Sequence, residues 1–163
     1  RQHEVEDEQL GLRGGDLLQG LLTAGGRLHP EPVDAQGPGD EAADLVLVGH
    51  SFGGAVVIKA GELHESVRGV ASMSPQLYGT RQVENLNKPL LLIHGMSDSI
   101  LSHEASEDIY RRALEPKRIV LYAEAGHSLI QAKQQIDDLL SDWIPARLGG
   151  VPDVGGREEY ETL

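Results

Sequence analysis

The amino-acid sequence predicts an α/β protein built on a parallel sheet of about four strands flanked by helices. From residue 45 to residue 144, apolar runs of strand length alternate with segments in which apolar residues have helical spacing. This alternation is typical of parallel sheets joined by right-handed crossovers. The run from Leu90 to Ile93 is apolar throughout, as expected of a strand covered on both faces. A chain of 163 residues is long enough for one domain with a core of its own.

The first strand and the first helix of this pattern flank a glycine-rich turn. Residues 45–48 are apolar and partly β-branched, and a helix is predicted from Phe52 to about residue 65. We expect Gly49 and Gly53 to be required in the turn between them, because a Cβ at either position would clash across it. Strand, sharp G-x-S-x-G turn and helix together would present Ser51 as a nucleophile. The alternative is an ordinary glycine-rich turn.

The later elements follow the same alternation. Leucine-rich and β-branched runs predict strands, and apolar residues at i, i+3 and i+4 predict helices, the last of which Pro145 ends. Between the second and third strands lies a short polar connection with about one helical turn. The predicted strands are 67–73, 89–94 and 118–122, and the predicted helices are 104–114 and 129–144.

The two ends of the chain differ from this folded portion, which spans residues 45–146. Residues 1–44 carry ten acidic and three basic side chains, and we expect an acidic, partly disordered segment with one helix near 14–24. Residues 147–163 are rich in glycine, proline and acidic residues, which predicts a disordered tail.

Three residues with catalytic potential follow three of the predicted strands. Ser51 follows the first strand, Asp98 the third and His127 the fourth. Because the carboxyl ends of parallel strands meet at one edge of a sheet, these side chains are expected to lie close together. A serine hydroxyl becomes a strong nucleophile when a base takes its proton and a carboxylate orients that base.

Each of these residues also has a simpler interpretation. Asp98 could be a turn former, with Asp108 as a weaker candidate for the acid, and His127 could be a solvated loop histidine. We interpret His94, which closes an apolar strand, as a buried structural histidine, and His50 as a residue that packs or hydrogen-bonds locally. No H-x-x-x-H pair is present, so neither a metal site nor a cofactor is predicted.

Residues 45–144 resemble the α/β-hydrolase family. The resemblance rests on Gly49-His50-Ser51-Phe52-Gly53-Gly54 as the nucleophile elbow, His94-Gly95-Met96-Ser97-Asp98 as the acid loop and Gly126-His127 as the base loop. The strand ending in Ser74-Pro75 is similar to that of small members related to dienelactone hydrolases and serine esterases. The connection that follows is too short for a lid, which suits small or soluble substrates. The resemblance implies the C-terminal half of the fold, with residues 45–146 as its catalytic portion and the N-terminal strands lacking.

The resemblance implies a serine hydrolase that cleaves a carboxylic ester or a related acyl bond through a Ser-His-Asp triad and an acyl-enzyme. Ser51 would attack the carbonyl, His127 would act as base and Asp98 would orient it. The backbone N–H of Phe52 would be one oxyanion donor, but no second donor is found in residues 1–44. We therefore expect weak activity or none from this chain alone. The alternatives are acyl transfer to another acceptor, or a non-catalytic or fragmentary homologue that binds a partner through an exposed sheet edge.

The composition bears on partners and location. A formal net charge of −12 argues against nucleic acid and anionic membranes as partners. The partner that the resemblance implies is a small-molecule ester or acyl compound. The strand at 45–48 is expected at the edge of the sheet, where it could mediate self-association or pair with a missing N-terminal half. Three explanations are open for the expected absence of that half: a truncated gene model, a true half-domain that pairs with another chain or copy, or a degenerate homologue. We favour the first. With no run of 18 apolar residues and no signal-peptide pattern, we expect a cytoplasmic protein.

Overall fold

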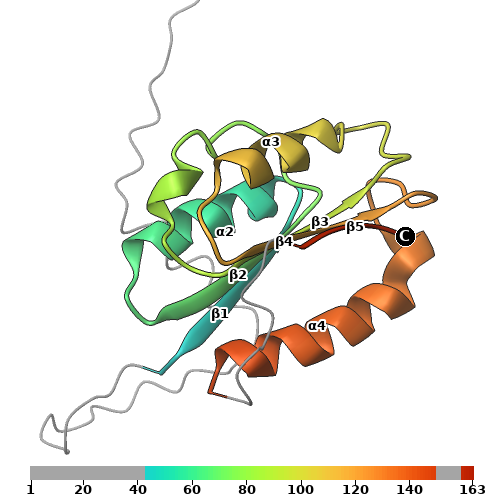
Figure 1. Cartoon of the computed structure of the whole chain (residues 1–163). Helices are drawn as coiled ribbons and strands as arrows, with labels where there is room; N and C mark the ends of the chain where they lie inside the picture. Colours follow the sequence, from blue (N-terminus) through green and yellow to red (C-terminus); the bar gives the residue numbers. More distant parts are fainter. Residues whose placement is uncertain (1–42, 150–158) are drawn as a thin grey trace, which may run out of the picture. The chain divides into compact units, whose positions relative to one another are not determined.

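The computed structural model describes residues 43–149 and 159–163, which form a parallel sheet with helices on both faces (Figure 1). The helix expected near 14–24 lies outside these residues. The strands are β1 (Leu45–His50), β2 (Val67–Met73), β3 (Leu90–Gly95), β4 (Lys117–Tyr122) and β5 (Glu159–Thr162). The α-helices are α2 (Phe52–Leu63), α3 (Glu104–Arg112) and α4 (Lys133–Arg147), with single 3-10 turns at η1 (Val83–Asn85) and η2 (Ile130–Ala132).

The strands lie side by side in chain order, and every neighbouring pair is parallel. All six residues of β3 are buried, which confirms the prediction of a strand covered on both faces. Within the described residues β1 pairs with β2 alone, and Leu45 and Val48 are more than 40% exposed. The strand that precedes Ser51 therefore lies at a sheet edge, as its place in the sequence pattern predicted.

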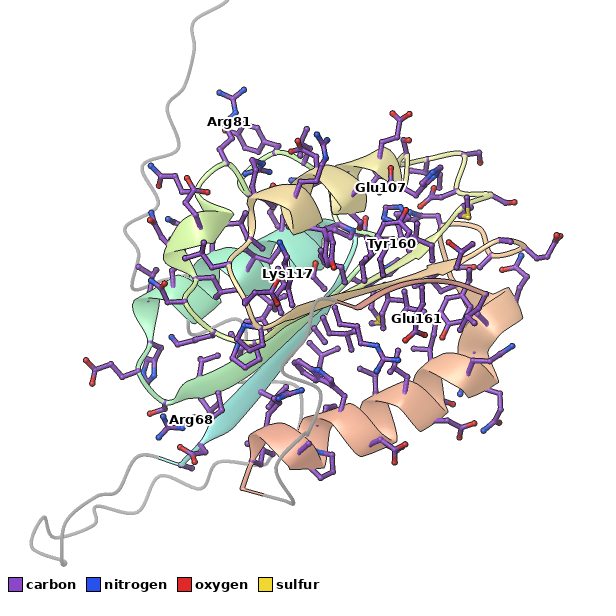
Figure 2. The ribbon with its side chains drawn as sticks, in the orientation of Figure 1. Arg68, Arg81, Glu107, Lys117, Tyr160 and Glu161 are labelled. Carbon is purple, nitrogen blue, oxygen red and sulfur yellow. The ribbon has the colours of Figure 1, made fainter. Side chains whose placement is uncertain are left out.

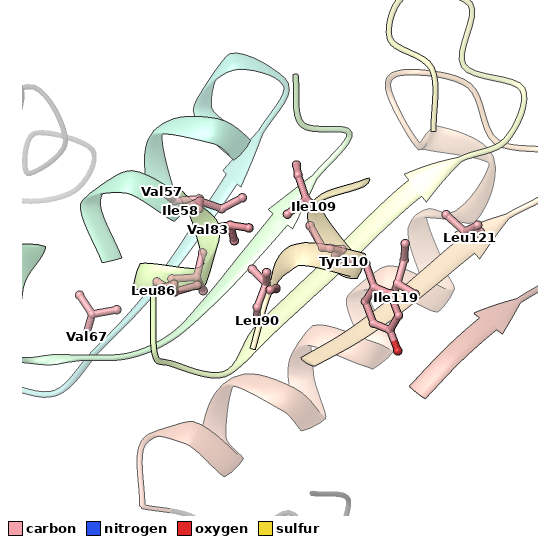
Figure 3. Close-up of a cluster of buried hydrophobic side chains, with 13 residues drawn as sticks. Val57, Ile58, Val67, Val83, Leu86, Leu90, Ile109, Tyr110, Ile119 and Leu121 are labelled. Atoms are coloured by element: carbon pink, nitrogen blue, oxygen red, sulfur yellow. The ribbon is translucent and has the colours of Figure 1, made fainter. Parts of the chain in front are cut away.

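Alternate residues of the central strands point to opposite faces of the sheet and form two separate cores. One core joins the sheet to α2, η1 and α3 through aliphatic side chains such as Ile58, Leu92 and Ile109 (Figure 3). The other joins it to α4 through Leu91, Ile136 and others. Helix α4 continues to Arg147, so Pro145 does not end it as predicted but lies in its last turn. Both cores hold the carboxyl ends of β1, β3 and β4 in fixed positions.

Strand β5 adds a fifth strand to the predicted sheet of about four, and it corrects the expectation of a disordered tail for residues 159–162. Residues 150–158 of that predicted tail lie outside the described residues. Strand β5 pairs in parallel with β4 and is tied to α3 and β4 by its side chains (Figure 2). The Tyr160 ring packs edge-on against Tyr110 with centroids 6.0 Å apart, and its hydroxyl donates to Glu107. Arg118 donates to the Glu161 carboxylate at 2.7 Å. Acidic residues are depleted in strands, so the composition of this segment conceals a strand that distant partners stabilise.

The connection from β4 through α4 to β5 differs in hand from the connection from β1 through α2 to β2. The sheet grows in one direction from β1 to β5, whereas α4 covers the face opposite to α2 (Figure 1). The right-handed crossovers expected from the sequence concern the connections between β1 and β4, and the connection to β5 lies outside that expectation. Helix α4 lies on the face opposite to α2 because its apolar side chains, such as Ile136, pack in the core that contains Leu91. The sheet continues in the same direction because β5 pairs with β4.

Candidate active site

The turn between β1 and α2 has the backbone geometry of a sharp elbow. Ser51 adopts φ 57° and ψ −121°, and its backbone N–H donates to the Met73 carbonyl at 2.8 Å. A Cβ added at Gly49 would lie 2.2 Å from the Gly53 carbonyl oxygen, so glycine is required there. The same requirement predicted for Gly53 is wrong, because a Cβ at Gly53 would meet no atom within 4 Å. The strained φ at Ser51 lifts its side chain clear of the strand.

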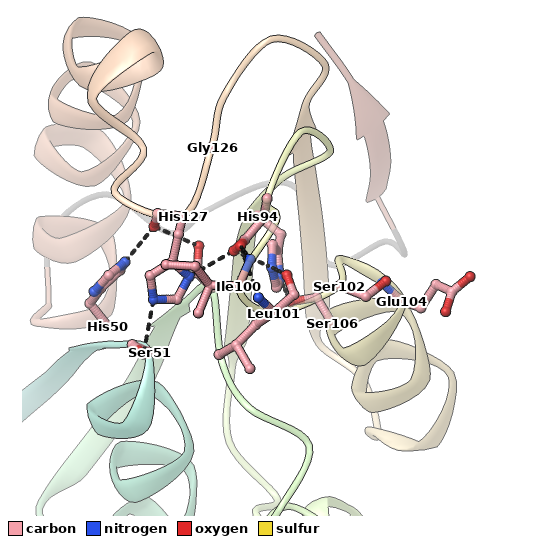
Figure 4. Close-up of polar contacts among 12 residues, drawn as sticks. His50, Ser51, His94, Ile100, Leu101, Ser102, Glu104, Ser106, Gly126 and His127 are labelled. Carbon is pink, nitrogen blue, oxygen red and sulfur yellow. Dashed lines mark hydrogen bonds and ion pairs between the residues drawn. The ribbon is translucent and has the colours of Figure 1, made fainter.

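The structure brings together Ser51, His127 and Asp98 from three different loops at the carboxyl edge of the sheet (Figure 4). His127 Nδ1 lies 2.7 Å from Asp98 Oδ2, and because a carboxylate only accepts, Nδ1 carries the proton. His127 Nε2 lies 3.0 Å from Ser51 Oγ and is therefore the acceptor for the hydroxyl proton. Both distances are those of ordinary hydrogen bonds. The arrangement can move a proton from Ser51 to His127 while Asp98 stabilises the imidazolium.

Asp98 is held by donors on both of its carboxylate oxygens. Oδ1 accepts from the backbone N–H groups of Ile100 and Leu101 at 2.8 and 2.9 Å, while Oδ2 accepts from His127. Burial acts to raise the pKa of Asp98, but the hydrogen bonds from Leu101, His127 and Ile100 outweigh it and lower the pKa below its ordinary value. Asp98 therefore stays a carboxylate, and its side chain is completely buried.

The loop that carries His127 is anchored through its backbone. His50 Nε2 donates to the His127 carbonyl at 2.7 Å, and the Ser74 hydroxyl donates to the same oxygen at 3.3 Å. His50 forms a hydrogen bond as expected, but its partner lies 77 residues away in the chain and not locally. A Cβ at Gly95 would lie 2.1 Å from the Ala125 carbonyl oxygen, so the end of β3 lies directly against this loop. The partner of Ser74 lies 53 residues away, and no local sequence signal indicates this contact.

His94, which we interpreted from the sequence as a structural histidine, also contacts the Asp98 carboxylate. His94 Nε2 donates to Asp98 Oδ2 at 3.2 Å and to the Leu101 carbonyl at 3.0 Å, while Nδ1 lies 2.8 Å from the Ser106 hydroxyl. His94 is completely buried, as a structural histidine would be, but its partner is the carboxylate that also holds His127. The spacing of four residues between His94 and Asp98 is the only sequence signal for this contact.

A cavity of about 410 Å³ lies between the ends of β1 and β2 and the start of α4. Its wall is mostly apolar, with Met73, Leu129, Ile130 and Ile136 among the lining residues and Lys133 and Asp137 as its charged ones. His50 and Ser128, the sequence neighbours of Ser51 and His127, also line it, whereas Ser51 and His127 themselves do not. A cavity of this size is within the range of small-molecule sites. In residues 43–149 and 159–163, no three His, Asp or Glu side chains gather as a metal site would require. None of the helices described combines the length and hydropathy of a membrane span.

Comparison with known proteins relates this site to an established fold. Residues 79–134 match the family model described as serine aminopeptidase, S33. The Escherichia coli (strain K12) protein YfhR, which is uncharacterized, is 30% identical over 133 residues, covering 62% of this chain and 47% of YfhR. The chain therefore spans about half the length of the curated relatives it matches.

Solved structures share the arrangement of strands and helices. The esterase domain of a Rhodothermus marinus protein is 25% identical with a TM-score of 0.56, covering 63% of this chain and 59% of that one. The monoacylglycerol lipase of Paleococcus ferrophilus has a TM-score of 0.60 at 16% identity, covering 64% of this chain and 69% of the lipase, a likeness of fold alone. The parallel sheet common to these structures, the strand–turn–helix at Ser51 and the matched segment show that the chain has the α/β-hydrolase fold.

Proposed function

We propose that this chain carries the catalytic residues of a serine hydrolase that cleaves a carboxylic ester or a related acyl bond. The observation that carries the proposal is the unbroken series of hydrogen bonds from Ser51 Oγ to His127 Nε2 and from His127 Nδ1 to Asp98 Oδ2, at 3.0 and 2.7 Å. Family and fold support it at a coarser level, because they point to hydrolases that act on acyl bonds.

In the first half of the proposed reaction, Ser51 forms the acyl-enzyme. Ser51 Oγ bonds to the substrate carbonyl carbon while its proton passes to His127 Nε2, and the imidazolium is stabilised by Asp98. The tetrahedral intermediate then breaks its bond to the leaving alcohol, which takes the proton back from His127. The acyl group remains as an ester of Ser51.

In the second half, water releases the acid by the same path. His127 takes a proton from water as the oxygen attacks the acyl carbon, and returns it to Ser51 Oγ as the ester bond breaks. The oxyanion of both intermediates would accept from the backbone N–H of Phe52. That group is one of the first N–H groups of α2 and so has no acceptor within the helix, whose positive end also favours the oxyanion.

The cavity lined by His50, the neighbour of Ser51 in the chain, supports a small substrate. At about 410 Å³ with an apolar wall, it would accept a short acyl or alkyl group. The connection between β2 and β3, residues 74–89, contains η1 as its only helical element, so it supplies no lid that could enclose a long chain. We expect faster hydrolysis of p-nitrophenyl acetate than of p-nitrophenyl palmitate, and a clear preference for palmitate would contradict this substrate size.

Labelling with a fluorophosphonate probe tests the nucleophile directly, because the probe reacts with an activated serine and needs no substrate. We expect labelling of the full chain that disappears in Ser51→Ala and drops strongly in His127→Ala. Ser99→Ala, which changes an exposed serine of the neighbouring loop, is the matched control and should label normally. A folded wild-type chain that does not label, or labelling that survives Ser51→Ala, would overturn the proposal.

A second function is suggested by the edge of the sheet. In the described part of the chain β1 has a neighbour on one side only, and Leu45 and Val48 are exposed there. An open strand edge offers backbone N–H and C=O groups to another strand. A non-catalytic role in which this edge binds a strand of a second copy or of another chain is the alternative to catalysis. Absence of labelling together with stable self-association would favour it.

A further inference from the structure

His94 lies beneath the site, at the carboxyl end of β3, and makes three polar contacts (Figure 4). Its Nε2 faces the carboxylate of Asp98 and the carbonyl of Leu101, and its Nδ1 faces the hydroxyl of Ser106 on α3. None of its side-chain surface is exposed to solvent. A buried imidazole with every nitrogen engaged can occupy only one orientation.

These contacts determine the tautomer of His94. Carboxylate and carbonyl oxygens only accept, so Nε2 must carry a proton. Burial lowers the pKa of His94, although the Leu101 carbonyl and the Asp98 carboxylate act to raise it, and the ring is neutral. A neutral ring with Nε2–H has a free lone pair on Nδ1, which accepts from the Ser106 hydroxyl at 2.8 Å. Ser106 therefore holds His94 in the tautomer that donates toward the site.

We propose that His94 is a positioning residue for the Asp98–His127 pair. Its Nε2–H occupies one lone pair of Asp98 Oδ2, at 3.2 Å, while His127 Nδ1–H occupies the other, at 2.7 Å. Together with the two backbone donors on Oδ1, this leaves the carboxylate no direction in which to rotate. His94 thus connects β3 and α3 to the proposed base through one oxygen atom.

The contact with His94 also affects the negative charge on Asp98 Oδ2. A donor on Oδ2 withdraws part of the negative charge that attracts the His127 imidazolium. When the donor is removed, the carboxylate should hold the imidazolium more strongly, which should move the acidic limb of the pH profile of labelling at Ser51 to higher pH. The other titratable groups near this pair are His50, whose ring centroid lies 4.9 Å from that of His127, and His103 at the start of α3. Neither makes a hydrogen bond to Asp98 in the described residues.

Nitrogen NMR of the histidine rings tests the tautomer without any variant. We expect His94 to show the Nε2–H tautomer and to be neutral at pH 7, because burial lowers its pKa. Protonation of His94 on Nδ1 alone, or a doubly protonated ring at pH 7, would overturn the proposal. The inference rests on the proposed function of Ser51, but this measurement needs no turnover, so an inactive chain can still support or refute it.

Two amide variants form a matched pair that tests the donor. The His94→Gln side chain can place an N–H near the position of Nε2, whereas His94→Asn is one methylene shorter and cannot reach Asp98. In His94→Asn we expect the acidic limb of the pH profile of fluorophosphonate labelling to move to higher pH, and in His94→Gln to stay at its wild-type position. A merely structural histidine would lower stability in both variants and leave this limb unchanged, which would refute the role.

Kinetics adds a separate readout if the chain is active. His94→Asn should lower kcat for a short nitrophenyl ester by about tenfold or more, because a small displacement of a catalytic group is costly, and leave KM nearly unchanged. The acidic limb of the pH profile of kcat should move upward with that of labelling, and His94→Gln should restore it. Absence of Ser51 labelling in the folded wild type would count against the proposed function, whereas an unmoved acidic limb in folded His94→Asn counts against the positioning role. If the Asn variant does not fold, a shifted limb in His94→Gln or the wrong wild-type tautomer refutes the positioning role.

Discussion

Replacing Gly49 by alanine should distort the turn that presents Ser51. The new Cβ would lie 2.2 Å from the Gly53 carbonyl oxygen, 2.6 Å from its carbonyl carbon and 2.9 Å from Val57 Cγ2. Because Cβ atoms essentially never come closer than 3.0 Å to such neighbours, the backbone must move by about 0.8 Å or more. Strand β1 is paired with β2 and Gly53 lies in the first turn of α2, so neither side of the turn moves freely.

The expected cost follows from this displacement. Overfilling a packed region costs about 1–3 kcal/mol, and we expect the free energy of unfolding of Gly49→Ala to fall by about 3 kcal/mol because the clash is with backbone. A shift of nearly 1 Å in a nucleophile costs on the order of 10² in rate, so fluorophosphonate labelling of Ser51 should slow by about that factor. Urea unfolding measures the first quantity and a labelling time course the second.

Gly53→Ala is the matched control, four residues away in the same motif. A Cβ at Gly53 meets nothing within 4 Å, and alanine is a better helix former than glycine by up to about 1 kcal/mol. The control should therefore be at least as stable as the wild type and should label at a similar rate. If Gly49→Ala unfolds at the same urea concentration as Gly53→Ala and labels equally fast, the reasoning about the turn is wrong.

Three further predictions concern charge and the sheet edges. Because the pKa of Asp98 is lowered in the folded state, its stabilising contribution is present above its ordinary pKa of about 4 and is lost as pH falls through the folded value. The free energy of unfolding in urea should therefore fall between pH 6 and pH 3, and Asp98→Asn should make this pH dependence weaker. The Glu107 carboxylate, through its hydrogen bond, raises the pKa of Tyr160 to about 12. The stability from this contact is therefore present below about pH 10 and lost as pH rises toward 12. Near-ultraviolet phenolate absorbance should show a late transition for Tyr160 that moves to lower pH in Glu107→Gln, and an unchanged curve would contradict the contact. Val48→Lys should reduce self-association through the exposed edge of β1 in sedimentation velocity, whereas Leu63→Lys, an exposed apolar position on α2, should not; equal sedimentation of all three proteins would argue against the edge.

Much of the fold could be predicted because its signals are local. The strands at β2 and β3 and the helices α2 and α3 lie within a few residues of their predicted bounds, since apolar periodicity and the flanking turns define them. Strand β5 could not be predicted this way, because Tyr160 and Glu161 find their partners on α3 and β4, more than 40 residues away. The same limit applies to Gly53, where the motif suggested a clash that the actual path of α2 avoids.

By itself the sequence determined which residues could take part in the chemistry. Ser51, Asp98 and His127 each follow an apolar run, and the parallel order of those runs is enough to bring their ends to one edge. Only the tertiary structure decided how these side chains are held, because the contacts of His94 with Ser106 and of His50 with the His127 loop join segments 12 and 77 residues apart. The physical reason is that strand direction is encoded locally, whereas hydrogen-bond geometry depends on how the packed helices and strands place side chains that are far apart in the chain.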